Sequence, residues 1–273
     1  NRDVLLPRYL YYFCKKFDFE RLNKTVTIPS LTKSDLLKIE IDLPDLEKQQ
    51  DVVDQLVKIE QIITLRKQEL EFLDDLIESR FVELFGDMTE NPNGWEVISL
   101  GKVCDVRDGT HDSPKYFTEG YPLVTSKIDF ADCSLICEDD YNKINERSKV
   151  DYGDILMPMI GTVGKPVIVD VEAEFAIKNV ALIKFYEDSK VINIFVKALL
   201  QSDYFDRTVI SKIRGGTQKF IALGDIRKLE ICLPPMETQK QFTVFVAQID
   251  KSKIASWFWH IYTNLCCRII YCI

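Results

Sequence analysis

One segment of the chain occurs twice, and this internal repeat constrains the folds that the sequence can adopt. Residues 31–49 reappear as residues 221–239 at a constant shift of 190 positions. Each copy ends in the motif Leu-Pro-x-x-Glu-x-Gln, which begins at Leu43 and at Leu233. The pattern predicts a short helix, a polar loop, a short strand (residues 38–43 in the first copy), the proline and a second helix. We therefore expect one complete unit and the end of another, with chance similarity as the alternative.

The residues after the first copy have the pattern of one long helix. No proline or glycine interrupts residues 45–85, and Gly86 supplies the stop expected after a helix. Such a helix extends about 60 Å, farther than one globular core requires. Its apolar residues recur at alternating steps of three and four, as a heptad seam that contains Leu56, Ile59, Ile63, Leu70, Leu73 and Ile77. We expect a coiled-coil spacer helix that packs against a partner helix, with packing on its own domain as the alternative.

A second helix of this kind begins after the second copy and then loses its pattern. Val246 and Ile249 occupy the positions that match Leu56 and Ile59 in the first helix. From residue 254 onward, tryptophan, cysteine and isoleucine replace both the heptads and the surface charges. We interpret residues 254–273 as an atypical apolar tail that a frameshift would explain, and a membrane anchor is the alternative.

Residues 89–236, between the two helices, begin with short β-type runs separated by turns, and helical patterns follow only near the end. This succession predicts an α+β domain with a β-rich part and a helical part, preceded by the long spacer helix. Hydrophobic residues make up 46% of the sequence, which is enough for one or two buried cores.

Three loops of this domain combine glycine with hydroxyl, amide and cationic side chains, at residues 109–115, 161–165 and 214–219. Glycine permits close backbone approach, while such side chains suit phosphate oxygens and base edges. The candidate DNA-binding residues are Thr110, His111, Ser113, Lys115, Lys127, Thr162, Lys165, Arg214, Thr217, Gln218 and Lys219. Among these, the expected phosphate ligands are Lys115, Lys165 and Arg214, and the expected base contacts are His111, Gln218 and Lys219. In the alternative, the glycines simply turn the chain.

The overall charge argues against a generic nucleic-acid binder. A net charge of -8 has the wrong sign for phosphate neutralisation, so any DNA-binding surface must be local. Residues 207–219 contain four cations and no acid, which makes them a local basic patch. The eight cysteines indicate reduced thiols in a cytoplasmic protein, because no secretory signal opens the sequence.

Catalytic motifs are absent from the sequence. The segment from Gly161 to Lys165 is too short for a phosphate-binding P-loop, and Pro166 follows where such a loop has serine or threonine. No nucleophile elbow or zinc-protease motif occurs, and no second pair at zinc-site spacing complements Cys133 and Cys137. We therefore expect no catalytic residue, no metal site and no cofactor bound to this chain.

Taken together, these motifs resemble a known family. Residues 109–116, 123–127 and 161–164 and the two Leu-Pro-x-x-Glu-x-Gln closures look like the specificity (S) subunit of type I restriction-modification enzymes. The resemblance implies two target-recognition domains, each reading half of a split DNA site. Two antiparallel helices would set the spacing of the halves and dock the methyltransferase (M) subunits, while a translocase/endonuclease (R) subunit cuts DNA. S-adenosylmethionine, ATP and magnesium would belong to these partners.

The resemblance also implies the organisation of the chain. Residues 1–43 would be the C-terminal remnant of a first target-recognition domain, residues 44–88 the spacer helix and residues 89–236 a complete second recognition domain. Residues 237–253 would start the second spacer helix, ahead of the tail at residues 254–273. We expect a non-catalytic DNA-binding subunit that binds double-stranded DNA and no membrane and is able to pair with itself through the spacer helix. The alternatives are a coiled-coil interaction protein without DNA binding and an S-adenosylmethionine-dependent methyltransferase with an unrecognised site.

Overall fold

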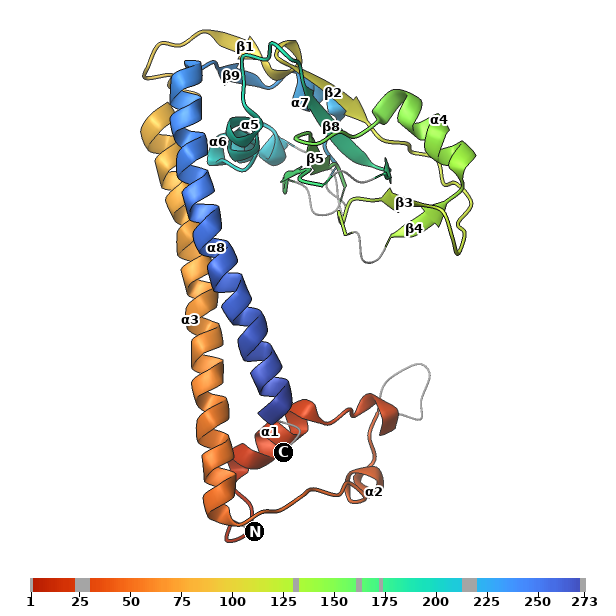
Figure 1. Cartoon of the computed structure of the whole chain (residues 1–273), viewed down its shortest axis with the longest axis vertical. Helices are drawn as coiled ribbons and strands as arrows, with labels where there is room; N and C mark the ends of the chain where they lie inside the picture. Colours follow the sequence, from red (N-terminus) through yellow and green to blue (C-terminus); the bar gives the residue numbers. More distant parts are fainter. Residues whose placement is uncertain are drawn as a thin grey trace. The chain divides into compact units, whose positions relative to one another are not determined.

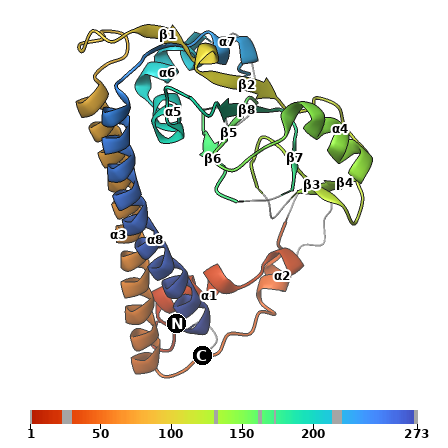
Figure 2. The same ribbon diagram turned by 45° about the horizontal axis from the view of Figure 1, so that its top comes forward.

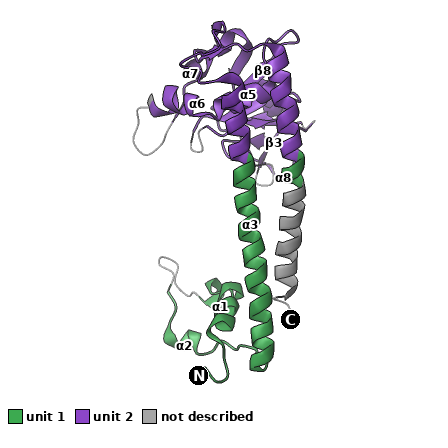
Figure 3. Cartoon of the chain, turned by 90° about the vertical axis from the view of Figure 1, so that its left-hand side faces the viewer, with its two compact units in different colours: residues 1–73, 251–273 green, residues 74–250 purple. Residues whose placement is uncertain are grey.

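The computed structural model describes residues 2–22, 30–129, 133–160, 164–171, 174–212 and 220–270, with residues 212 and 255–270 described by their backbone alone. The chain divides into two compact units (Figure 3). Unit 1 contains residues 1–73 and 251–273, and unit 2 contains residues 74–250. The fold is a mixture of helices and sheets, which confirms the expected α+β class.

Unit 1 is helical in the residues that the structure describes. Its elements are α1 (Pro7–Lys16), the 3-10 helix η1 (Glu20–Leu22), α2 (Lys33–Leu36) and most of α3 (Leu46–Phe85). Tyr12 of α1 is buried against Val53 and Leu56 of α3. The Tyr12 hydroxyl donates to Glu60 Oε2 at 2.8 Å, and the Lys15 ammonium pairs with Glu60 Oε1 at 2.8 Å. The hydrogen bond from Lys15 holds the pKa of Glu60 below its usual value.

Unit 2 contains the described sheets. A four-stranded antiparallel sheet has the order β2 (Cys104–Asp108), β8 (Val180–Phe185), β5 (Ile155–Pro158) and β6 (Val167–Ile168). A second sheet has the order β4 (Ser134–Ile136), β3 (Tyr121–Val124) and β7 (Ala176–Ile177), with β3 and β7 parallel. β1 (Val97–Ser99) pairs with β9 (Glu230–Cys232). The β-rich part therefore precedes most of the helices, as the sequence predicted.

The helices of unit 2 lie beside these sheets (Figures 1 and 2). They are η2 (Leu100–Lys102), α4 (Glu138–Ser148), α5 (Asn193–Leu200), α6 (Asp203–Thr208), η3 (Ile210–Lys212), α7 (Leu223–Arg227) and the first part of α8 (Met236–Ile270). α4 contacts β7. β9 is followed closely along the chain by α8 (Figure 1). The backbone of α8 stays helical as far as Ile270, past the point where the heptad pattern ends.

The end of α3 and the start of α8 belong to the main hydrophobic core of unit 2. The ring of Phe242 on α8 lies 5.7 Å from that of Phe81 and 5.4 Å from that of Phe85 on α3. Phe195 of α5 stacks on Phe81 at 5.8 Å. The Arg80 guanidinium lies over the Phe245 ring. The packing unit is therefore larger than the recognition domain expected at residues 89–236.

The heptad seam lies on the covered side of α3. Its six predicted residues, from Leu56 to Ile77, are all buried or half-buried. Residues between them, such as Leu65 and Phe72, are 63% and 70% exposed. The helix therefore carries one covered and one open apolar stripe.

The two copies of the repeat have the same order of elements but differ in one. α2 and α7 occupy matching positions, as do Pro44 and Pro234 ahead of the long helices. The strand expected at residues 38–43 is wrong, because residues 39–43 have no regular structure. Its counterpart β9 is a strand because β1 pairs with it from Val97 to Ser99. A strand needs a neighbour to bond its backbone, and the local pattern carries no information about that neighbour.

No helix among the described residues is long and apolar enough to cross a membrane. The side chains of residues 255–270 lie outside this description, as does the whole of residues 271–273. The interpretation of residues 254–273 as an atypical tail therefore stays a prediction.

Candidate nucleic-acid interface

The first predicted loop, residues 109–115, is held against the second sheet at the end of β2. The Thr110 backbone N–H donates to the Ile177 carbonyl at 2.9 Å, and its carbonyl accepts from the Asn179 N–H at 3.1 Å. Gly109 is required at the start of the loop, because a Cβ there would lie 2.4 Å from the Ile177 carbonyl oxygen. The loop therefore starts from a defined position on rigid strands.

A chain of polar contacts then orients His111. Its Nδ1 lies 2.9 Å from Asn179 Oδ1, and its Nε2 lies 3.1 Å from Asp108 Oδ2. The other oxygen of Asp108 accepts from Arg147 Nη2 of α4 at 2.8 Å, and the same Nη2 donates to the Gly109 carbonyl at 3.2 Å. Both partner atoms are oxygens that accept, so a neutral imidazole, which carries a single N–H, donates to only one of them at a time. Both ring nitrogens of His111 thus have partners within the chain, so reading a base through either nitrogen requires one of these contacts to open.

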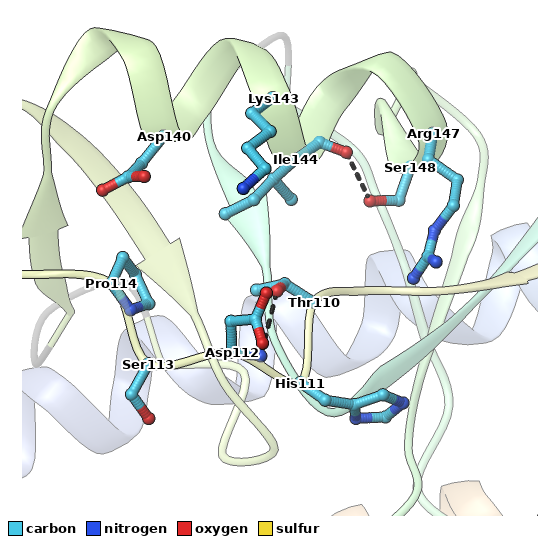
Figure 4. A pocket seen from close by; sticks show the side chains of 10 residues that line it. All are labelled: Thr110, His111, Asp112, Ser113, Pro114, Asp140, Lys143, Ile144, Arg147 and Ser148. Atoms are coloured by element: carbon cyan, nitrogen blue, oxygen red, sulfur yellow. Dashed lines mark hydrogen bonds between the residues drawn. The ribbon is translucent and has the colours of Figure 1, made fainter.

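A cavity of about 560 Å³ opens between this loop and α4 (Figure 4). Its lining side chains combine donors and acceptors: Thr110, His111, Asp112, Ser113, Pro114, Asp140, Lys143, Ile144, Arg147 and Ser148. Lys143 points from α4 toward the loop (Figure 4). The mixed charge of this lining suits a polar group that both donates and accepts hydrogen bonds, as base edges do.

Lysines stand on this loop and on the segments that follow β7 and β3. Lys178 donates from Nζ to Ser113 Oγ at 2.7 Å, so Ser113 also has a partner within the chain. Lys115 and Lys127 are exposed, and neither forms an ion pair with a residue that the structure describes. Lys127 follows β3, whose Val124 carbonyl accepts from the Lys178 N–H. These side chains are available for phosphate oxygens.

The residues that flank the other two predicted loops pair with each other. Ile160 and Phe220 form an antiparallel bridge, so the segments that carry the second and third loops adjoin the same backbone bridge. Lys165 is exposed. The remaining predicted residues lie outside the described residues, namely Thr162, Arg214, Thr217, Gln218 and Lys219.

Sequence reasoning missed the contribution of α4. Lys143 and Arg147 are four residues apart, a spacing that places both on one face of a helix. That spacing was the available signal, but it does not show which loop the face meets. Lys178 and Asn179 were missed because their role comes from a backbone bridge between Thr110 and Lys178.

The buried Asp154 carboxylate of unit 2 has a structural partner. The Lys184 ammonium pairs with Asp154 at 2.6 Å and with Asp151 at 2.8 Å. Burial raises the pKa of Asp154, while the bond from Lys184 acts in the opposite direction. Burial also raises the pKa of the Cys104 thiol to about 12, which makes it a poor nucleophile. No three His, Cys, Asp or Glu side chains gather as a metal site in the described ranges.

Comparisons with known proteins identify the family of the chain. The chain matches the family model described as the type I restriction modification DNA specificity domain over residues 1–74 and 92–256. It is 27% identical over 268 residues to the type I restriction enzyme MjaVIII specificity subunit of Methanocaldococcus jannaschii. It is 25% identical over 278 residues to the MjaIX specificity subunit of the same organism. The alignments cover 89% and 88% of this chain.

Solved structures share the fold. The HsdS subunit of Thermoanaerobacter tengcongensis matches with a TM-score of 0.50 and 21% identity, over 99% of this chain and 70% of that one. The type I restriction-modification S subunit of M. genitalium matches with a TM-score of 0.59 and 16% identity, over 99% and 72%. The chain spans 63% and 62% of the length of its two archaeal relatives. Because the family model matches most of its length, the chain belongs to the type I restriction-modification DNA specificity family.

Proposed function

We propose that this chain is a non-catalytic specificity subunit whose unit 2 reads one half of a split DNA target. The observation that carries this proposal is the anchored loop at residues 109–114, which lies beside exposed lysines on a rigid frame. Sequence-reading side chains must be held in place before DNA arrives, because base contacts discriminate only in a defined geometry. Chemistry would then belong to partner subunits, which carry S-adenosylmethionine, ATP and magnesium.

The domain boundaries stay a proposal, with residues 1–43 as the end of a first recognition domain. Exposed apolar residues of α1 support it. Leu10 is 39% exposed, whereas Val196, the equivalent residue on α5, is fully buried in the core of unit 2. Tyr11 of α1 is 52% exposed. A domain like that of residues 89–236 would cover these side chains as unit 2 covers α5.

The open apolar stripe of α3 supports docking of partner subunits. Ile62, Leu65, Phe72 and Leu76 recur at helical spacing and are 42%, 63%, 70% and 46% exposed. A helix with two apolar stripes belongs in a bundle of more than two helices. We propose that M subunits dock on this stripe, that the R subunit joins the resulting complex, and that a second copy is able to pair along the seam. We expect the complex in the cytoplasm, where reduced thiols such as those of Cys14 and Cys137 persist.

The experiment is a selection of random DNA duplexes by the chain in complex with its M subunits. Enrichment of one half-site is expected, and Lys115→Ala and Lys127→Ala should each lower the log-log salt slope of binding by about one. Lys102→Ala is the matched control, because Lys102 is exposed on η2 and lies outside the candidate interface. Assembly without DNA binding would favour a coiled-coil interaction protein. DNA methylation by the isolated chain would favour a methyltransferase.

A further inference from the structure

A buried glutamine ties the start of α8 to the body of unit 2. Gln239, in the first turn of α8, is fully buried. Its Nε2 donates to the carbonyls of Lys190 at 2.9 Å and Pro234 at 3.0 Å. Its Oε1 accepts from the Ile192 N–H at 2.8 Å. The orientation of the amide is fixed, because two carbonyls and one N–H can be satisfied in only one way.

Gln49 makes the same three bonds in unit 1. It is also fully buried, in the first turn of α3. Its Nε2 donates to the carbonyls of Val4 at 2.9 Å and Pro44 at 2.7 Å, and its Oε1 accepts from the Leu6 N–H at 2.9 Å. Leu6 and Ile192 are the N-cap residues of α1 and α5. Each glutamine therefore joins the entry of a short helix, the proline of the repeat and the first turn of a long helix.

The chemistry of these bonds leaves few alternatives to glutamine at either position. Burying an amide is costly unless its polar atoms are bonded, and here three bonds compensate the loss of water. Methionine has the required length but no donor, and a carboxylate has no proton for the two carbonyls. All three partners are backbone atoms, so the bonds fix the course of the chain whatever side chains those segments carry.

We propose that Gln49 and Gln239 are positioning residues that fix the direction in which each long helix leaves its unit, and so fix the spacing between the DNA half-sites. The second part rests on the proposed function. α8 has 35 residues and is therefore about 52 Å long. A tilt of about 10° at its start moves the far end by roughly 9 Å, and successive base pairs are about 3.4 Å apart. A loose joint would thus shift the second half-site by two or three base pairs.

The first test measures the joint without DNA. Unnatural amino acids that carry spin labels replace Lys102 and Ile254, which are both exposed. Double electron–electron resonance then gives the distribution of distances between the two labels. Gln239→Glu, which keeps the side-chain volume, should broaden this distribution at alkaline pH, where the buried carboxyl is ionised, while circular dichroism stays unchanged. In acid, the protonated carboxyl regains one donor, so the distribution should narrow again. The matched control is Gln241→Glu on the exposed side of the same helix.

Gln239→Met, which removes all three bonds, should broaden the distribution at every pH. If this variant fails to fold, Gln239→Glu alone decides the question. If folded Gln239→Glu gave at alkaline pH a distribution of distances as narrow as that of the unchanged protein, the proposed role of Gln239 would be overturned.

The second test measures spacing in the complex with M subunits and a second recognition domain. Duplexes that differ in the number of base pairs between the half-sites compete for binding. The unchanged protein should prefer one spacing by at least tenfold, and Gln239→Glu should reduce this preference severalfold while affinity for an isolated half-site stays the same. An unchanged preference despite a broadened distance distribution would overturn the link to spacing. Absence of DNA binding by the unchanged complex would contradict the proposed function and leave the joint standing.

Discussion

The aromatic cluster of unit 2 allows a quantitative prediction about the helix ends. Phe242 is fully buried, and its ring meets those of Phe81 and Phe85 edge to face at 5.7 and 5.4 Å. Truncation of a buried phenylalanine costs about 3–5 kcal/mol, and the two ring contacts place Phe242→Ala near the upper end. Val244→Ala, on the same helix and 60% exposed, should change stability by less than about 0.5 kcal/mol.

The assay is native-state hydrogen exchange of the backbone amides of β5 and β8, since these strands are central in the sheet and report global opening of unit 2. We expect their free energy of opening to fall by about 4 kcal/mol in Phe242→Ala and to stay constant in Val244→Ala. A loss below about 1 kcal/mol would refute the reasoning, because the helix ends would then be an attachment to the domain instead of part of its core.

Further predictions concern the basic patch, the seam and an ion pair. Arg214→Ala should weaken duplex binding and lower the log-log salt slope by about one, and an unchanged slope would place the DNA elsewhere. Leu70→Asp should abolish the pairing of two copies through the seam by burying an unpaired charge, whereas Glu71→Lys on the exposed side should not; sedimentation separates these outcomes. The Arg207 guanidinium lowers the pKa of Asp87 from 3.8 to about 2. The pair therefore stabilises the folded state above pH 3.8, and this contribution to the free energy of unfolding is lost as the pH falls through 2. In an acid unfolding titration, Asp87→Asn should lack this loss of stability.

Local sequence signals were enough for the long helix and the repeat. The helix expected at residues 45–85 is observed as Leu46–Phe85, because propensity, uninterrupted length and the glycine stop act within a few residues. Gly86 has the positive φ of 71° that the stop requires. The two Leu-Pro-x-x-Glu-x-Gln motifs likewise marked where each long helix begins, and the α+β class followed from the order of patterns.

The candidate site required the tertiary structure. His111 meets Asn179 across 68 positions, and Arg147 meets Asp108 across 39, so no local pattern specifies either contact. The same reason explains why residues 39–43 do not form a strand. They have the sequence pattern of β9, but no described segment pairs with them as β1 pairs with β9. The sequence by itself determined which segments are helical and which residue types stand in the loops. Only the tertiary structure decided which polar groups meet and which apolar faces are covered, because hydrogen bonding and burial depend on residues that are distant along the chain.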